Sequence, residues 1–557
     1  MRPAVSETSV SCVSKDRPDS AKVAHRVKVL LTHSYFLRLD PKQSQKLRPY
    51  PPLATLYAAA NLRARGYQVA VFDAMLADSP ADFTAYFERH EPDIVVLYED
   101  NFNFLSKMCL ARMREAALTM AETAKAGGVP VAAAGSDVTD HPDIYLAGGV
   151  DFAVLGEGDH TVVELLEWLK DQPSGVRVRP DHIPGLAFAA SSPEITGVQA
   201  AAPMADELLN QPATQSVELL RTPKRNNERH PDVFPFPARE LIDMEQYRQL
   251  WQEHHGYFSL NLVSTRGCPF HCNWCAKPIW GQRYAMRSPA DVAEELSQVK
   301  QVWHPDHIWF ADDIFGLRPS WVSEFSREVA TRDAAVPFTI QSRCDLMTPE
   351  AVAGLRAAGC HEVWLGAESG SQSVLDAMDK GISVEQIRTA RQRLGDAGIR
   401  ASFFVQFGYP GERWDDVLAT VELVRDTLPD NIGVSVSYPL PGTRFHALVA
   451  DQLRAKANWD ESGDLDMMFK GTYTTPFYRQ LHLVLHDDLS LHRRKAGLED
   501  VPHPLLEAVS ADEHERRVAR AWATLEELEE SCRNGDPTEL CQIDHTPTAP
   551  DLSRPFN

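Results

Sequence analysis

The chain has 557 residues, too many for one hydrophobic core, and its apolar (43%) and charged (24%) fractions are ordinary for a globular protein. Its 78 acidic and 56 basic residues give a net charge of −22, which disfavours a nucleic acid as the main partner, because phosphate binding depends on an excess of Lys and Arg. The sequence contains no apolar stretch of about 20 residues, so it predicts no membrane span. The N-terminus lacks the apolar region of a signal peptide, so we expect a cytoplasmic protein.

The first 200 residues predict a binding domain. Residues 1–25 are polar and predict a disordered lead-in. Over residues 26–200, helical patterns alternate with five short apolar runs, at 26–33, 68–74, 93–98, 129–135 and 151–158. This alternation predicts an α/β fold, a Rossmann-like doubly wound parallel sheet, which binds ligands beyond the carboxyl ends of its strands. Residues 201–255 lose the periodicity, are rich in proline and charge, and predict a linker.

A second alternation of strands and helices occupies residues 256–455. Helix start signals stand at Ser288, Thr348 and Ser383, and Gly359 and Gly398 are helix stop signals. Six strand–helix units predict a partial (β/α)6 barrel, with strands at 259–265, 307–311, 337–342, 361–366, 400–407 and 432–438. Residues 456–557 predict a mainly helical region that includes an amphipathic helix over 511–530 and ends in a polar tail.

Three of the nine cysteines form a CxxxCxxC motif directly after the first barrel strand: Cys268, Cys272 and Cys275. In a reducing compartment, clustered cysteines predict a metal or redox site rather than disulfides. Three thiolates are enough to hold an iron–sulfur cluster with one iron left open. The alternative is a zinc site with His271 as the fourth ligand.

With Trp274 before its last cysteine, this motif resembles that of the radical S-adenosylmethionine (radical SAM) superfamily. The resemblance spans about residues 256–450 and implies a 4Fe-4S cluster whose open iron binds S-adenosylmethionine. It also implies S-adenosylmethionine contacts for residues at the predicted carboxyl ends of the strands: Trp274 near adenine, Asp312 and Asp313 at the amino group, Arg343 at the carboxylate, and Glu368 and Ser369 at the ribose. A helix cap at Asp312–Asp313 and a structural ion pair at Arg343 are the alternatives.

The segment "RPYPPLATLYAAANLRARGYQVAVFDA" and the loops that follow it resemble the cobalamin-binding domain that precedes the barrel in one radical SAM subgroup. Small-residue loops after the fourth and fifth strands are candidate cobalamin contacts, and simple βα turns are their alternative: Gly135, Ser136 and Asp137, and Gly156, Glu157 and Gly158. The DxHxxG loop of cobalamin carriers is replaced by "LTHSYF", which keeps only His33. The lower ligand of the cobalt is then open. It is His33, or the cobalt has no protein ligand there, and His141 is a weaker candidate. The Glu99–Asp100–Asn101 stretch binds corrin amides or caps a helix.

The resemblance implies a cobalamin-dependent radical SAM enzyme. The leading hypothesis is methylation of an unactivated carbon of a small-molecule metabolite, through a 5′-deoxyadenosyl radical and methylcobalamin. It implies a one-electron donor such as flavodoxin or ferredoxin. The alternatives are an oxidative cyclase or rearrangement enzyme, a cobalamin sensor or carrier without catalysis, and a tRNA methylthiotransferase. The last of these requires a second cysteine cluster, whereas residues 1–200 hold only Cys12 and Cys109.

The C-terminal segment 456–510 is expected to close over the substrate. Tyr473, Phe477 and Tyr478 either line its pocket or belong to the hydrophobic core.

Overall fold

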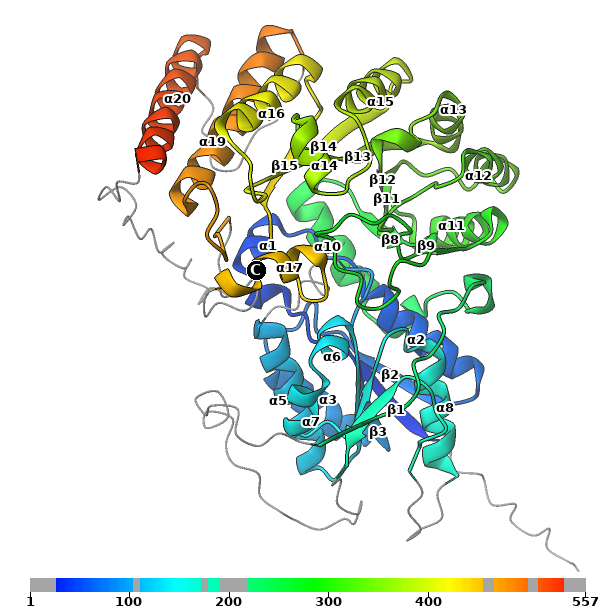
Figure 1. Ribbon diagram of the computed structural model, residues 1–557. Helices are drawn as coiled ribbons and strands as arrows, with labels where there is room; N and C mark the ends of the chain where they lie inside the picture. Colours follow the sequence, from blue (N-terminus) through cyan, green and yellow to red (C-terminus); the bar gives the residue numbers. More distant parts are fainter. Residues whose placement is uncertain are drawn as a thin grey trace, which may run out of the picture.

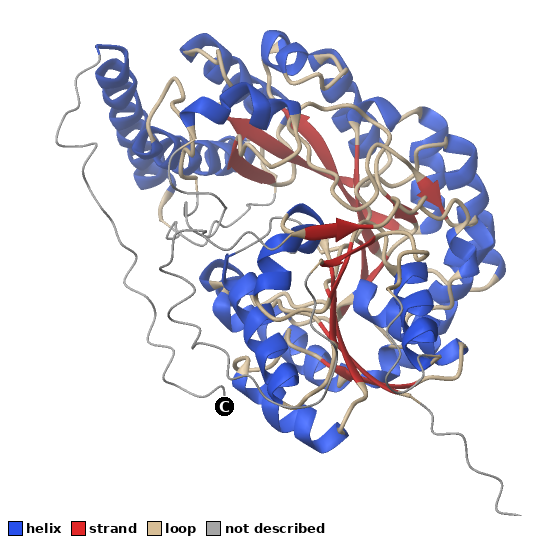
Figure 2. Ribbon diagram, turned by 60° about the horizontal axis from the view of Figure 1, so that its bottom comes forward, coloured by secondary structure: helices blue, strands red, loops and turns tan. Residues whose placement is uncertain are grey.

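The computed structural model describes residues 27–103, 111–171, 179–190, 218–453, 465–498 and 509–534. They form an N-terminal α/β domain, a curled half-barrel with helices on its outer face, and two long helices beyond the end of the half-barrel (Figure 1). Figure 2 shows the two large sheets, each covered by helices. The predicted lead-in over residues 1–25, part of the predicted linker and the end of the C-terminal tail lie outside the described residues.

The N-terminal domain is built on a seven-stranded sheet of order β2-β1-β3-β4-β5-β6-β7. The first five strands are parallel, and the last two join antiparallel. The parallel part has the 2-1-3-4-5 order of one common doubly wound fold, so the predicted Rossmann-like class is confirmed. The strands are β1 (Lys28–Thr32), β2 (Gln68–Phe72), β3 (Ile94–Tyr98), β4 (Val131–Ala134), β5 (Phe152–Val154), β6 (Leu186–Ala189) and β7 (Leu219–Arg221).

Helices cover both faces of this sheet, which is why its central strands are apolar on both sides. Helices α2 (Leu53–Ala64) and α8 (Asp159–Lys170) bury one core with the sheet, and α3 (Ala81–His90) and α5 (Ala111–Ala126) bury the other. Every residue of β3 is buried. Shorter helices complete the domain: α1 (Pro41–Lys46), α6 (Ser136–Asp140) and α7 (Pro142–Ala147).

The segment predicted as a linker contains regular structure. It supplies strand β7 and helix α10 (Met244–His255). Helix α10 buries Met244, Tyr247 and Trp251, spaced three and four residues apart as one helix face requires. Proline and charged residues around α10 make this spacing of apolar residues hard to recognise in the sequence. Strand β7 has three residues, too few to show an alternation of buried and exposed positions.

The half-barrel has six parallel strands in the order β15-β14-β13-β12-β11-β8, which confirms the predicted partial barrel. The capping signals at Ser288, Thr348 and Ser383 act as N-caps. The strands are β8 (Ser259–Leu262), β11 (His307–Phe310), β12 (Phe338–Ser342), β13 (Cys360–Glu368), β14 (Arg400–Phe407) and β15 (Ile432–Val436). The helices are α11 (Pro289–Trp303), α12 (Pro319–Thr331), α13 (Pro349–Ala358), α14 (Gln372–Ala377), α15 (Val384–Asp396), α16 (Trp414–Thr427) and α17 (Arg444–Val449).

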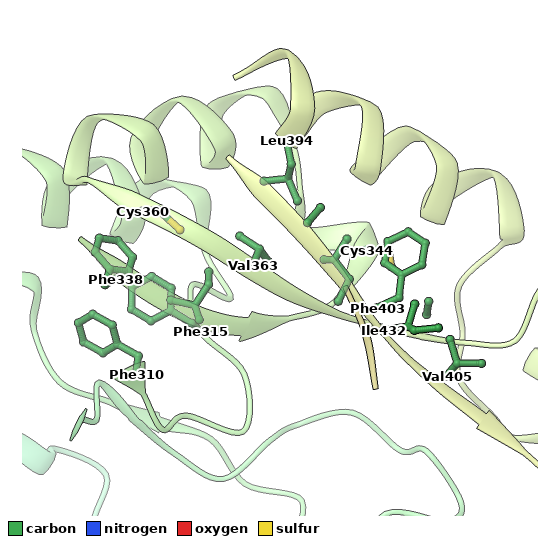
Figure 3. Close-up of a cluster of buried hydrophobic side chains, with 14 of the residues drawn as sticks. Phe310, Phe315, Phe338, Cys344, Cys360, Val363, Leu394, Phe403, Val405 and Ile432 are labelled. Atoms are coloured by element: carbon green, nitrogen blue, oxygen red, sulfur yellow. The ribbon is translucent and has the colours of Figure 1, made fainter. Parts of the chain in front are cut away.

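The main core lies between these strands and their outer helices (Figure 3). Phe310, Phe338 and Phe403 project into it from three of the strands and are fully buried. Cys344 and Cys360 belong to the same core, and burial raises the pKa of the Cys344 thiol to about 12. These two cysteines therefore serve packing and stand apart from the CxxxCxxC motif.

A segment of the N-terminal domain enters the concave side of the half-barrel. The Tyr50 hydroxyl lies 3.0 Å from Ser259 Oγ, and its ring centroid lies 4.8 Å from that of Trp309. The Asn261 side chain donates to the Pro51 carbonyl at 2.9 Å. Ser259 and Asn261 alternate with Leu260 and Leu262 of the outer core, so they face the concave side. These contacts join the two domains at the first strand of the half-barrel.

Two long helices complete the described chain, α19 (Thr475–Lys495) and α20 (Ala511–Asn534). Tyr473, just before α19, and Phe477 and Tyr478, in its first turn, pack in the main core. The ring centroids of Tyr473 and Phe477 lie 4.1 Å apart in a stacked arrangement. Among the described residues, none of the helices has the length and apolar character needed to span a membrane.

Candidate active site

The cysteine motif lies in a loop that is closed at its base. The two-residue strands β9 (Thr265–Arg266) and β10 (Ala285–Met286) pair antiparallel on either side of it. Gly267 has a positive φ of 77°, and a Cβ there would come within 2.4 Å of the Arg283 carbonyl. A glycine is required at this position, because any side chain would push the two sides of the base apart.

The three thiols are free and partly exposed. Burial, followed by the charge of Asp313, raises the pKa of the Cys275 thiol to about 12, and burial also raises that of Cys268. The thiols act on one another electrostatically, so they face a common region. In the described chain, no three Cys, His, Asp or Glu side chains converge on one metal ion. A cluster binds each cysteine to a different iron, so three neighbouring thiols fit it without such convergence.

Arg343, at the end of β12, lies beside the motif. Its Nη1 is 4.0 Å from the sulfur of Cys272, and its guanidinium stands 3.8 Å from the centroid of the Phe270 ring. The same nitrogen donates to the Lys380 carbonyl at 2.8 Å, and Nε pairs with Asp345 at 2.9 Å. Arg343 is therefore a structural ion-pair partner, and it also faces a cysteine of the motif.

The end of β13 carries a buried ion pair. Lys380 Nζ lies 2.6 Å from Glu368 Oε1, and both side chains are almost fully buried. Burial alone would lower the pKa of Lys380, but the charges of Glu368 and Cys272 raise it overall. Ser369 lies next to Glu368, and its hydroxyl is 3.1 Å from that of Thr420. The two residues predicted to contact the ribose thus have protein partners already.

The two aspartates after β11 have different surroundings. Asp312 is buried and accepts hydrogen bonds from Ser264 N, Ser264 Oγ and Thr265 N at 2.6–2.8 Å. Burial raises its pKa to about 6. Asp313 is exposed and acts electrostatically on Cys268 and Cys275. Asp312 therefore holds the strand from which the cysteine loop leaves, whereas Asp313 faces the thiols.

The far side of the cysteine loop is anchored on the barrel. Asn273 N donates to the Met378 carbonyl at 3.1 Å, and the Tyr409 hydroxyl donates to Asn273 Oδ1 at 3.0 Å. The neighbouring Trp274 packs against an apolar cluster that contains Tyr409, and its buried Nε1 has no hydrogen-bond partner in the described chain. Sequence reasoning missed Asn273, Tyr409 and Lys380, whose partners all lie elsewhere in the sequence.

The predicted cobalamin loop after β4 combines packing with an unpaired group. A Cβ on Gly135 would come 2.8 Å from the side chain of Glu99, so the glycine permits close packing of β3 and β4. Asp137 forms an ion pair with Arg114 and accepts from Tyr145 at 2.9 Å. The Ser136 hydroxyl is buried and has no partner among the described residues.

The predicted loop after β5 joins the two domains. Glu157 Oε1 lies 2.5 Å from Arg266 Nη1, and Asp159 Oδ2 lies 2.8 Å from the same nitrogen. Arg266 immediately precedes the cysteine loop, and all three side chains are buried. Gly156, with a positive φ of 73°, approaches the carbonyl of Ile279 in that loop. Glu157 thus has an interdomain role that a βα turn does not predict.

The other candidates in this domain also have partners. His33 is buried, and its Nε2 lies 3.1 Å from Asp73, so this nitrogen is already occupied. Glu99 accepts from Ser34 N at 3.1 Å. Asp100 accepts from Ala54 N, in the first turn of α2, at 3.0 Å and from Phe102 N, in the segment after it, at 3.3 Å. Asn101 is different, because its buried Oδ1 has no partner in the described chain.

The carboxyl edge of the N-terminal sheet therefore meets the cysteine loop. The rings of Phe102 and Trp280 stack with their centroids 5.2 Å apart across this junction. Beside them lies a cavity of about 10 Å³, lined in part by Asn101, Glu157 and Arg266. It has the space of about one water molecule, far too little for a corrin. The unpaired Ser136 Oγ and Asn101 Oδ1, at the ends of β4 and β3, fit hydrogen bonds to the amides of a corrin over this edge.

Comparison with known proteins matches both halves of the chain. The family model of the Radical SAM superfamily matches residues 262–424, and that of the B12 binding domain matches residues 48–166. An uncharacterized methyltransferase of Pyrococcus horikoshii is 25% identical over 427 residues, covering 75% of this chain and 83% of the relative. The anaerobic magnesium-protoporphyrin IX monomethyl ester cyclase of Rubrivivax gelatinosus is 25% identical over 415 residues, covering 72% and 67%.

Two solved structures share the fold of nearly the whole chain. TsrM of Kitasatospora setae, a radical S-adenosylmethionine methyltransferase solved with cobalamin and a 4Fe-4S cluster, superposes with a TM-score of 0.61 and 17% identity, covering 92% of this chain and 100% of that one. OxsB, a cobalamin-dependent S-adenosylmethionine radical enzyme, superposes with a TM-score of 0.64 and 14% identity, covering 91% and 72%. At this level of identity the likeness shows the common fold.

Proposed function

Because this chain belongs to the radical SAM superfamily and a B12-binding domain precedes its radical SAM core, we propose that it transfers a methyl group to an unactivated carbon of a small molecule. The observation that carries the proposal is the junction between the domains. The carboxyl edge of the B12-binding sheet contacts the loop of Cys268, Cys272 and Cys275 through Arg266, Phe102 and Trp280. A corrin held at that edge would lie next to a cluster held by the cysteines, as hydrogen abstraction followed by methyl transfer at one carbon requires.

When bound, the cluster supplies the electron that cleaves S-adenosylmethionine to a carbon-centred radical, and cobalamin carries the methyl group. The three thiols hold the cluster, and because burial raises the pKa of two of them, metal binding displaces their protons. Arg343 and Lys380 place positive charge near Cys272. We propose that Asp313, Glu368 and the Trp274 indole contact S-adenosylmethionine and that Ser136 and Asn101 contact the corrin. Asp312 keeps the cysteine loop in place.

The test is anaerobic turnover of the reconstituted chain with an extract of small metabolites from the organism that makes it. We expect 5′-deoxyadenosine and S-adenosylhomocysteine to form together, each matched to the methylated product. A Cys272→Ala variant is the matched negative control. Turnover that yields 5′-deoxyadenosine and product without S-adenosylhomocysteine would contradict methyl transfer.

That contrary outcome defines the second candidate, oxidative cyclisation. A specific observation supports it, because the Rubrivivax gelatinosus cyclase is as similar to this chain (25% identity) as the Pyrococcus horikoshii methyltransferase, over almost the same length. Cyclisation would use the same cysteines and the same domain order. Its product would lack the methyl group of S-adenosylmethionine, and mass spectrometry with a deuterated methyl donor separates the two reactions.

A further inference from the structure

The guanidinium of Arg343 uses all of its N–H groups within the protein. Its Nε and Nη2 donate to the two carboxylate oxygens of Asp345 at 2.9 and 3.2 Å, and Nη2 also donates to the Gly381 carbonyl at 3.3 Å. Its Nη1 donates to the Lys380 carbonyl at 2.8 Å and lies 4.0 Å from the sulfur of Cys272. An arginine side chain has five N–H groups, so these contacts leave none for the carboxylate of S-adenosylmethionine.

Two short segments and an aromatic ring hold Arg343 in this orientation. One segment is the 3₁₀ turn Cys344–Leu346, which directly follows Arg343 and carries Asp345. The other is the loop between α14 and α15, whose consecutive carbonyls accept from the guanidinium. One face of the guanidinium stands over the Phe270 ring of the cysteine loop, 3.8 Å from its centroid. The Arg343 side chain is only 7% exposed, so its place beside the cysteine is fixed by the fold.

The positive charge of Arg343 is directed at Cys272. Asp345 binds the edge of the guanidinium formed by Nε and Nη2, whereas Nη1, which faces the sulfur, lies outside that fork. The Asp345 side chain is 23% exposed. Water therefore screens the carboxylate more than it screens the buried guanidinium, and the pair keeps a cationic side toward the thiol.

The other two thiols of the motif have different surroundings. The charge of Asp313 acts on Cys268 and Cys275, and the charge of Lys277 acts on both with the opposite sign. A cluster held by the three cysteines would therefore have Arg343 at one of its ligands only. Reduction adds one negative charge to an iron–sulfur cluster, so a cation and an N–H group beside a ligating sulfur stabilise the reduced state and raise the reduction potential.

We propose that Arg343 raises the reduction potential of the iron–sulfur cluster through Cys272 and does not bind the carboxylate of S-adenosylmethionine. Arg343 is then a positioning residue for electron uptake, because its charge makes the cluster a better acceptor for the single electron of the external donor. The inference rests on the cluster of the radical SAM core. It does not depend on whether the reaction that follows is methyl transfer or cyclisation.

The test is the midpoint potential of the cluster in full-length protein reconstituted with cluster and cobalamin. Anaerobic titration with dithionite, without S-adenosylmethionine, is followed by the low-temperature EPR signal of the reduced cluster. Arg343→Gln should make reduction about tenfold less favourable, a shift of about 59 mV to more negative potential for one electron. Arg343→Lys keeps the charge and should shift the potential less.

Asp345→Asn should move the potential in the opposite direction. It removes the negative charge behind the guanidinium and leaves the cation beside Cys272, so the reduced cluster becomes more stable. Loss of a purely structural contact would not produce shifts of opposite sign at the two partners of one ion pair. The matched control is Arg388→Gln, which breaks an exposed pair with Asp426 and should leave the potential unchanged.

The second measurement is the dissociation constant of S-adenosylmethionine for the oxidised protein, by equilibrium dialysis of the labelled compound. Wild-type protein and Arg343→Gln should agree within about threefold, whereas a loss of about tenfold or more would mean that Arg343 binds the carboxylate, and the proposal would be overturned. Unchanged potentials in the Arg343 variants, or shifts of the same sign in Arg343→Gln and Asp345→Asn, would overturn it as well. If Arg343→Gln holds no cluster, Arg343→Lys and Asp345→Asn decide the question. Neither measurement needs turnover, so a failure of methyl transfer leaves their outcome unaffected.

Discussion

Replacing Arg266 by methionine should destabilise the junction between the two domains. The Arg266 side chain is 5% exposed, and its Nη1 lies 2.5 Å from Glu157 Oε1 and 2.8 Å from Asp159 Oδ2, whose side chains are 3% and 7% exposed. The substitution leaves two buried carboxylates close together without a cation. Removing one partner of a buried ion pair costs about 3–5 kcal/mol, and we expect a loss of this size.

The assay is urea unfolding followed by tryptophan fluorescence, for which Trp280 is a local reporter because its indole nitrogen lies 3.4 Å from Glu157. Arg388→Met is the matched control, since Arg388 forms an exposed pair with Asp426 and its loss should cost about 0–1 kcal/mol. Combining Arg266→Met with Glu157→Gln and Asp159→Asn should recover most of the stability. The reasoning is refuted if Arg266→Met is as stable as the control, or if the triple variant is no better than the single one.

Three further predictions concern individual groups. Cys268→Ala should abolish both the iron–sulfur absorption of the reconstituted chain and its cleavage of S-adenosylmethionine. The control Cys360→Ala changes a cysteine of the core and should keep the absorption. Equal absorption in both variants would refute the assignment. Asp312→Ala leaves three buried donors without an acceptor, so it should lower the free energy of unfolding in urea by about 2–4 kcal/mol. A loss below about 1 kcal/mol would count against the conclusion that Asp312 holds the strand before the cysteine loop. The pKa of Glu412 is raised from 4.5 to about 8, so its stabilising contribution is complete below pH 4.5 and is lost as the pH rises through 8. Wild-type protein should therefore lose more stability than Glu412→Gln between about pH 6 and about pH 9, and parallel pH profiles would contradict this.

The strands and the helix boundaries were predictable because their signals are local. The five parallel strands of the first sheet and the six of the half-barrel are short apolar runs, and the caps at Ser288, Thr348 and Ser383 need only neighbouring residues. The cysteine motif is equally local. The signals of two elements are weaker. Strand β7 has only three residues, and helix α10 has three buried residues among charged ones, so their segment is predicted as a linker.

The partners of the site residues were not predictable, because tertiary structure alone brings them together. Asp312 is 48 residues from Ser264, and Glu157 is 109 residues from Arg266. The sequence predicts acidic groups at strand ends but cannot tell a carboxylate that faces a ligand from one that holds a loop. The insertion of Tyr50 into the half-barrel likewise depends on elements that are distant in the sequence.

The central claim is that cobalamin on this chain carries a methyl group from S-adenosylmethionine toward a substrate carbon. The most direct test is anaerobic incubation of the reconstituted chain with reductant and S-adenosylmethionine bearing a deuterated methyl group, followed by mass spectrometry of the extracted cobalamin. The account predicts deuterated methylcobalamin formed one-for-one with S-adenosylhomocysteine. Formation of 5′-deoxyadenosine with no labelled methylcobalamin would contradict it.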